Sequence, residues 1–110
     1  TSNFSIVLTQ DQPLIWEERW CVLGDDRLEQ NLADLTLQFS VNGKPLDAGQ
    51  LYVHYAGDGV LCKVFSVVIS AWPPGKSILE YAATIKWPVD NGMNIYLKGT
   101  TKFVYSVTRR

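Results

Sequence analysis

Residues 60–81 read VLCKVFSVVISAWPPGKSILEY and combine two β-type runs with a sharp corner between them. Side chains alternate between the two faces of a strand, so every second position from Leu61 to Ile69 falls on one mainly apolar face, interrupted only by Lys63. The corner WPPG at 72–75 ends this run, because two prolines remove backbone donors and glycine permits a positive φ. A second β-type run follows at 78–87. We expect this unit to form the centre of an all-β sandwich.

Short alternating runs recur along the chain, with turn residues between them. Strands are expected at 4–10, 14–23, 33–41, 51–55, 60–71, 78–87, 94–98 and 102–108. Asn42-Gly43 is the strongest hairpin signal, because both residues tolerate the positive φ of a type I′ turn. Asp25 or Asp26 could cap a short helical turn that ends near Leu32. The spacing predicts a single domain over 1–110, an antiparallel two-sheet β-sandwich of about seven or eight strands.

The two cysteines, Cys21 and Cys62, are separated by 62 − 21 = 41 positions and allow two interpretations. Both could be buried free thiols, as is common for cysteine. They could instead form one disulfide between two strands, which the even number favours. The alternation of 14–23 turns Cys21 away from the face that carries Trp16 and Trp20, so a buried bridge would need a β-bulge there. We expect the bridge, and with it an oxidising, extracytoplasmic compartment.

Several function classes lack their usual sequence signals. The net charge of −1, with no basic block, gives no electrostatic footprint for nucleic acid, and every apolar run is far below the roughly 20 residues of a membrane span. One histidine, His54, and two thiols do not form a metal-ligand set, and the turn carboxylates lack calcium-loop spacing (they are Asp25, Asp26, Asp58 and Asp90). No GxSxG motif or assembled nucleophile and base occurs. We therefore expect no cofactor, no metal and no enzyme.

The chain resembles the immunoglobulin-like and fibronectin-type-III-like β-sandwich domains of bacterial secreted and cell-surface proteins. The residues that carry the likeness are ISAWPPGK at 69–76 followed by Tyr81, the ending VYSVT at 104–108, and Trp20-Cys21 followed by the strand from Leu35 with its Asn42-Gly43 turn. An antibody domain has a tryptophan between its two cysteines, and none lies between Cys21 and Cys62. The resemblance implies a non-catalytic module excised from a larger extracellular or surface chain. Its role would be that of a spacer or an adhesion domain that binds a protein partner or neighbouring domains of the same chain.

The aromatic residues leave a second function open. Alternation places Trp16, Trp20 and Trp87 in the core, while Trp72 at the corner is open to either packing or exposure and Tyr96 is expected to face solvent. Exposed tryptophan and tyrosine side chains stack on sugar rings, so Trp72 and Tyr96 are candidate ligand contacts of a carbohydrate-binding module. An exposed coplanar pair would favour sugar binding, and burial would favour the spacer or adhesion role.

Overall fold

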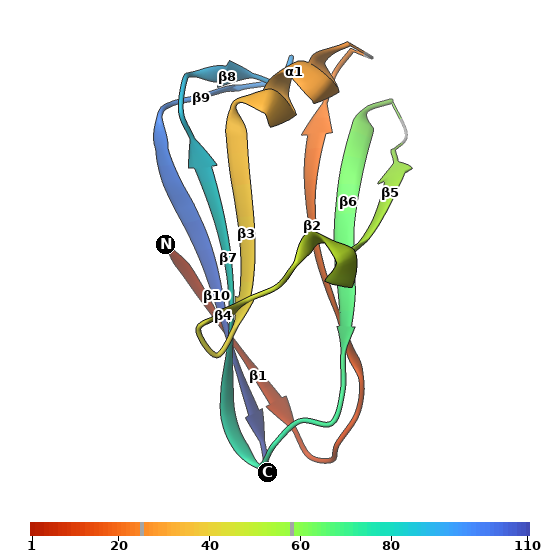
Figure 1. The fold of residues 1–110 in the computed structure, drawn as a ribbon, viewed down its shortest axis with the longest axis vertical. Coiled ribbons are helices and arrows are strands. Elements are labelled where there is room, and N and C mark those ends of the chain that lie inside the picture. Colours follow the sequence, from red (N-terminus) through yellow and green to blue (C-terminus); the bar gives the residue numbers. More distant parts are fainter. Residues whose placement is uncertain (25, 58) are drawn as a thin grey trace.

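The computed structural model describes residues 1–24, 26–57 and 59–110, so Asp25 and Asp58, both expected in turns, lie outside the described residues. Two packed β-sheets form the body of the protein (Figure 1). The larger sheet consists, in spatial order, of β1 (Ser2–Leu8), β10 (Gly99–Arg109), β7 (Gly75–Ile85), β3 (Leu35–Val41) and β4 (Lys44–Pro45). The smaller sheet consists of β2 (Leu14–Val22), β6 (Leu61–Ile69) and β5 (Tyr52–Ala56). The predicted all-β, multi-sheet architecture is confirmed.

Short elements close the two ends of the sandwich. The upper end in Figure 1 carries helix α1 (Arg27–Ala33) and the small hairpin of β8 (Val89–Asp90) and β9 (Ile95–Tyr96). The lower end carries the turns 9–13 and 70–74, and the short helix η1 (Ala48–Gln50) lies in the segment that crosses between the sheets. Helix α1 follows Asp26 as predicted, but the Asp26 side chain makes no capping hydrogen bond.

The prediction that all strands pair antiparallel is wrong for β1. This strand runs parallel to β10, from Ser2 opposite Phe103 to Leu8 opposite Arg109. The other pairings of both sheets are antiparallel. After β1 the chain crosses to β2 in the other sheet, so no tight hairpin fixes the direction of β1. Alternation shows which face a side chain occupies but carries no information on strand direction.

The hairpin predicted at Asn42-Gly43 joins β3 to β4, and both residues have positive φ, 50° and 80°. The Asn42 side chain adds a long-range contact, because its Oδ1 accepts a hydrogen bond of 2.7 Å from the Ile78 backbone N–H of β7. The turn therefore fixes the register of β3 against its neighbour β7 as well as against β4.

Aromatic rings fill the core between the sheets. Trp16 of β2 packs edge-on against Phe39 of β3 at 5.2 Å between ring centroids, and Phe39 packs on Tyr81 of β7 at 5.1 Å. The buried core residues are Leu8, Trp16, Phe39, Trp72, Leu79, Tyr81, Ala83 and Val107. Glu18 also points inward, where its Oε2 accepts hydrogen bonds from the Trp16 indole N–H at 3.1 Å and the Tyr105 hydroxyl at 2.8 Å. Both hydrogen bonds offset the cost of placing this carboxylate in the core.

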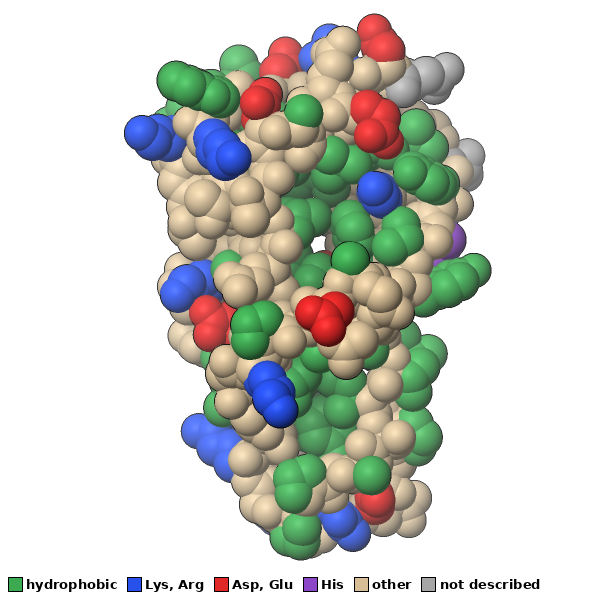
Figure 2. Space-filling model, viewed as in Figure 1, with side chains coloured by type: hydrophobic (Ala, Val, Ile, Leu, Met, Phe, Trp, Pro, Cys, Tyr) green, Lys and Arg blue, Asp and Glu red, His purple; other side chains and the backbone are tan. Residues whose placement is uncertain are grey.

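The sheets leave an opening along the edge formed by β3 and β5. Figure 2 shows hydrophobic side chains in a hollow between the sheets, crossed at mid-height by the segment that contains Asp47 and η1. The Lys63 ammonium of β6 lies over the rings of Tyr55, at 5.9 Å, and Phe65, at 5.6 Å. The core is therefore open between the two sheets along this edge (Figure 2).

Candidate functional site

A second opening lies on the opposite edge, near the upper end, between β2 and the first half of β10. It is an aromatic cleft of about 340 Å³. One wall comes from the inner face of the larger sheet, namely Tyr81, Ala83, Ile85, Thr101 and Phe103. The other walls are Arg19, Trp20 and Cys21 of β2 and Asn91, Met93, Asn94 and Tyr96 of the β8–β9 region. Two of the sequence-predicted residues, Cys21 and Tyr96, thus meet at one cleft.

Two aromatic pairs line the aromatic cleft. Trp20 and Tyr96 pack together with centroids 5.0 Å apart and planes at 56°, and Tyr81 and Phe103 stack at 5.9 Å with planes at 21°. Trp20 is half-buried, so the core prediction for it holds only in part. The tilt between Trp20 and Tyr96 removes the flat platform on which a sugar ring stacks.

Hydrogen bonds from two buried asparagines hold the cleft in shape. Asn31 of α1 accepts a bond from the Trp20 indole N–H at 3.0 Å and donates one to the Asp90 carbonyl at 3.0 Å. Asn91 donates to the Cys21 carbonyl at 3.2 Å, and its Oδ1 accepts the backbone N–H groups of Met93 and Asn94. Helix α1, β2 and the hairpin therefore form one preorganised unit.

Gly92 and Asp90 set the turn of this hairpin. Gly92 has φ +90°, and a Cβ there would lie 2.6 Å from the Leu23 carbonyl oxygen, so only glycine fits. The Gly92 backbone N–H donates to Asp90 Oδ1 at 2.8 Å, and Arg27 lies 3.3 Å from Oδ2. The Gly92 hydrogen bond first, and the Arg27 guanidinium second, lower the pKa of Asp90.

Exposed apolar side chains lie in and next to the β8–β9 hairpin. The hairpin patch, defined here as Trp87, Met93, Ile95 and Leu97, exposes between 48% and 75% of each side chain. The prediction that Trp87 is core is wrong, because β7 ends at Ile85 and the alternation that placed Trp87 inside does not continue beyond the strand. The alternate apolar residues Met93, Ile95 and Leu97, next to a turn, are the sequence signal for this surface, although alternation predicts only a strand at 94–98.

The disulfide between Cys21 and Cys62 is present and joins directly opposed residues of β2 and β6, with Cα atoms 4.0 Å apart. The ladder between β2 and β6 is continuous through this pair, so the bridge forms without the β-bulge that the alternation argument required, and Cys62 is only 2% exposed. Both sulfurs are bonded, so neither thiol is available as a nucleophile next to His54.

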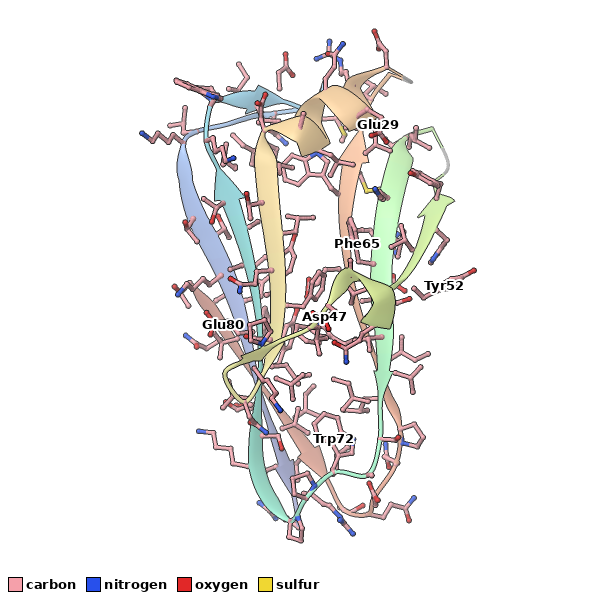
Figure 3. The ribbon with its side chains drawn as sticks, in the orientation of Figure 1. Glu29, Asp47, Tyr52, Phe65, Trp72 and Glu80 are labelled. Carbon is pink, nitrogen blue, oxygen red and sulfur yellow. A yellow bond between two sulfur atoms is a disulfide. The ribbon has the colours of Figure 1, made fainter. Side chains whose placement is uncertain are left out.

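Trp72, the other predicted ligand contact, is only 3% exposed, and this correction removes it from any binding surface. Its indole N–H donates to the Gln12 carbonyl at 3.0 Å and its backbone N–H to Asp11 Oδ1 at 3.0 Å. Figure 3 shows Trp72 inside the lower end of the sandwich, whereas Tyr52 points outward from β5. Trp72 and Tyr96 therefore lie at opposite ends and cannot act on one ligand.

No group of three or more metal-ligating side chains comes together in the part of the chain that the structure describes. Within the same residues, no helix has the length and apolar character needed to cross a membrane. Comparison with protein-family models, with curated proteins and with solved structures gives no match for this chain.

Proposed function

We propose that this protein is a non-catalytic, extracellular or cell-surface module that binds a protein partner through its upper end. The observation that carries the proposal is the hairpin patch, a set of exposed large apolar side chains beside a preformed aromatic cleft. Exposed clusters of this kind mark interaction sites, and tryptophan is enriched among the residues that dominate binding energy. The asparagine network supports the proposal, because it reduces the entropy lost when the surface is occupied.

The strand order favours an immunoglobulin-like assignment. The smaller sheet, β2-β6-β5, matches strands B, E and D of that fold, and β10-β7-β3-β4 matches G, F, C and C′. On this correspondence α1 lies in the B–C connection and the hairpin in the F–G connection, the positions that carry binding loops in variable domains. The disulfide departs from that pattern, because it joins the B and E positions instead of B and F. It supports an oxidising compartment.

Photo-crosslinking in the native cells tests the proposal. A benzophenone amino acid at Leu97, in the hairpin patch, should give a discrete protein adduct that mass spectrometry identifies. The same probe at Lys76, near the lower end, should give none. The purified partner should then bind the wild-type chain and lose at least tenfold in affinity on Trp87→Ser with Leu97→Ser. Equal adducts at both positions would contradict the proposal.

The carbohydrate alternative predicts a different result. A glycan array should then show binding that depends on Tyr96, the remaining predicted aromatic contact, and Tyr96→Ala should abolish it. The burial of Trp72 and the 56° tilt of Trp20 against Tyr96 favour the protein partner.

A further inference from the structure

Strand β5 is the outermost strand of the smaller sheet (Figure 1). It pairs with β6 through Tyr52–Ala56, and no described strand pairs with it on its other side. Internal segments set this position, because β4 and η1 precede β5 in the chain and β6 follows it. The backbone groups on such a free edge form a template for an added strand.

The sequence of β5 lacks the protection that edge strands normally carry. It reads YVHYA and contains no proline, no lysine or arginine and no carboxylate. Tyr52, Val53 and Tyr55 are each at least 40% exposed. The end strand of the larger sheet, β4, is by contrast Lys44-Pro45, and both a charge and a proline oppose pairing with another strand. An unprotected apolar edge of this kind indicates a surface that another chain covers.

The register between β5 and β6 decides which side chains an added strand would meet. Val53 lies opposite Phe65, and Tyr55 lies opposite Lys63. Phe65 packs against Phe39 of the larger sheet at 6.1 Å between ring centroids, so it faces the space between the sheets (Figure 3). Residues two positions apart share a face, so both pairs belong to the inner face. Alternate residues of an added strand would therefore lie next to Val53 and Tyr55 on this face.

Lys63 gives this inner face a positive charge that no described carboxylate neutralises. Each ion pair among the described residues uses a different cation. The inward carboxylate of the neighbouring β2, Glu18, accepts hydrogen bonds from Trp16 and Tyr105 instead. The Lys63 ammonium leans over the Tyr55 ring, toward the free side of β5. An added strand would lie two strand spacings from β6, about 10 Å, which extended lysine and glutamate side chains span together.

Two carboxylates near the hollow limit how acidic the occupant can be. Figure 3 shows Glu29 at the upper border of the hollow and Asp47 in the segment that crosses it. Their negative charge disfavours an occupant that is acidic throughout. Charge complementarity therefore favours one carboxylate, placed beside Lys63.

We propose that β5 binds an extended segment of a protein by strand addition. An aliphatic residue of the segment packs beside Val53, and a carboxylate two positions away lies next to Tyr55 and pairs with Lys63. Main-chain pairing supplies affinity, and these two side chains supply specificity. A second copy of β5 offers no carboxylate, so it would leave Lys63 without a partner. The site lies on the opposite edge from the aromatic cleft, and the inference is independent of the proposed function.

A phage-displayed library of random 12-residue peptides, selected on the full chain, is the probe. Selection should enrich peptides in which an aliphatic residue and Asp or Glu are separated by one position. Their affinity should fall at least about tenfold on Lys63→Met, which removes the charge and keeps the length of the side chain, and Lys63→Arg should restore it. Lys76→Met, at an exposed position of β7, is the matched control and should change the affinity by less than about twofold.

Methylation of single backbone nitrogens in a selected peptide tests the main-chain pairing. Neighbouring N–H groups of a strand point to opposite sides, so only every second one can donate to β5. Methylation at these positions should lower the affinity at least about tenfold, and methylation at the positions between them should be tolerated. Amide hydrogen exchange at Tyr52–Ala56 should slow in the complex.

Three results would overturn the β5 site. The first is a library that yields no peptide tighter than about 100 μM, or whose peptides all bind the Lys63→Met and Lys76→Met variants equally. The second is a methylation scan without alternation, which would show that the peptides dock without forming a strand. The third is dimerisation of the chain, measured by sedimentation velocity and lost on Val53→Lys, which would assign this edge to a second copy.

Discussion

Two Trp-Pro pairs, Trp72-Pro73 at the lower end and Trp87-Pro88 at the upper end, each follow a long strand, and the fold treats them in opposite ways. Trp72 is 3% exposed, whereas Trp87 is 67% exposed. The difference comes from distant residues, because Asp11 and Gln12 supply hydrogen-bond acceptors to Trp72 and the Arg109 guanidinium donates to its carbonyl. The lower end uses its tryptophan to close the sandwich, and the upper end leaves its tryptophan available for contact.

The largest expected effect is the difference in stability between alanine variants of the two tryptophans. Trp72→Ala should lower the free energy of unfolding by about 3–5 kcal/mol, because it removes a buried ring and leaves a cavity. Trp87→Ala should change it by less than about 0.5 kcal/mol, as expected for an exposed side chain. Urea denaturation of both variants measures the difference. Similar losses of stability in both variants would contradict the conclusion that only the lower end uses its tryptophan to close the sandwich.

The second effect concerns the disulfide between Cys21 and Cys62, of which Cys21 lines the aromatic cleft. Cys21→Ala with Cys62→Ala should cost about 3–4 kcal/mol, the loop-entropy value for a separation of 41 residues. Alkylation without reductant, followed by intact-mass measurement, should modify neither cysteine of the wild-type chain. Two alkylated thiols in protein kept under oxidising conditions would argue against both the bridge and the extracellular assignment.

A smaller effect tests the corner next to Trp72. Gly75 has φ +95° and no heavy atom within 4 Å of a built Cβ, so Gly75→Val should cost about 1–3 kcal/mol through backbone strain alone. Gly49 has equal space and no positive φ, which makes Gly49→Val the matched control. The melting temperature should fall in the first variant and much less in the second. An unchanged melting temperature for Gly75→Val would show that the corner tolerates a side chain.

The smallest expected effect is a pH dependence of the stability of the fold, caused by Glu18, which lies between the two ends. Burial raises the pKa of this carboxyl, and the hydrogen bonds from Tyr105 and Trp16 oppose that rise only in part. A raised folded-state pKa means that the folded chain binds the proton more tightly than the unfolded chain. Stability therefore falls as the pH rises from the unfolded value of 4.5 through the higher folded value. Glu18→Gln should reduce the change in the free energy of unfolding with pH, measured by urea denaturation at several pH values. An unchanged pH dependence would show that other groups cause it.

Much of the strand layout followed from alternation, because hydrophobic periodicity encodes which face of a strand is buried. The inward Trp16 was predicted this way, whereas the Asn42-Gly43 turn was predicted from the positive φ that both residues tolerate. Alternation fails where a strand ends, as Trp87 shows, because beyond Ile85 the backbone no longer repeats every two residues.

The aromatic cleft could not be predicted from the sequence, for a different reason. Its walls join Trp20, Tyr81, Tyr96 and Phe103, which are brought together by strand order and register. The corner at Trp72 likewise depended on Asp11 and Gln12, some 60 positions away.

The parallel pairing of β1 with β10 has a mechanical consequence. Ser2 and Arg109 lie at opposite ends of a ladder of seven paired positions. Tension applied through the start of β1 and the end of β10 would therefore slide the strands past each other and load all of these contacts at once. An antiparallel pair would place the pulled ends side by side and peel open one rung at a time. A module with this arrangement resists stretching, and the bridge between Cys21 and Cys62 keeps the intervening 41-residue span from unravelling even after the ladder breaks.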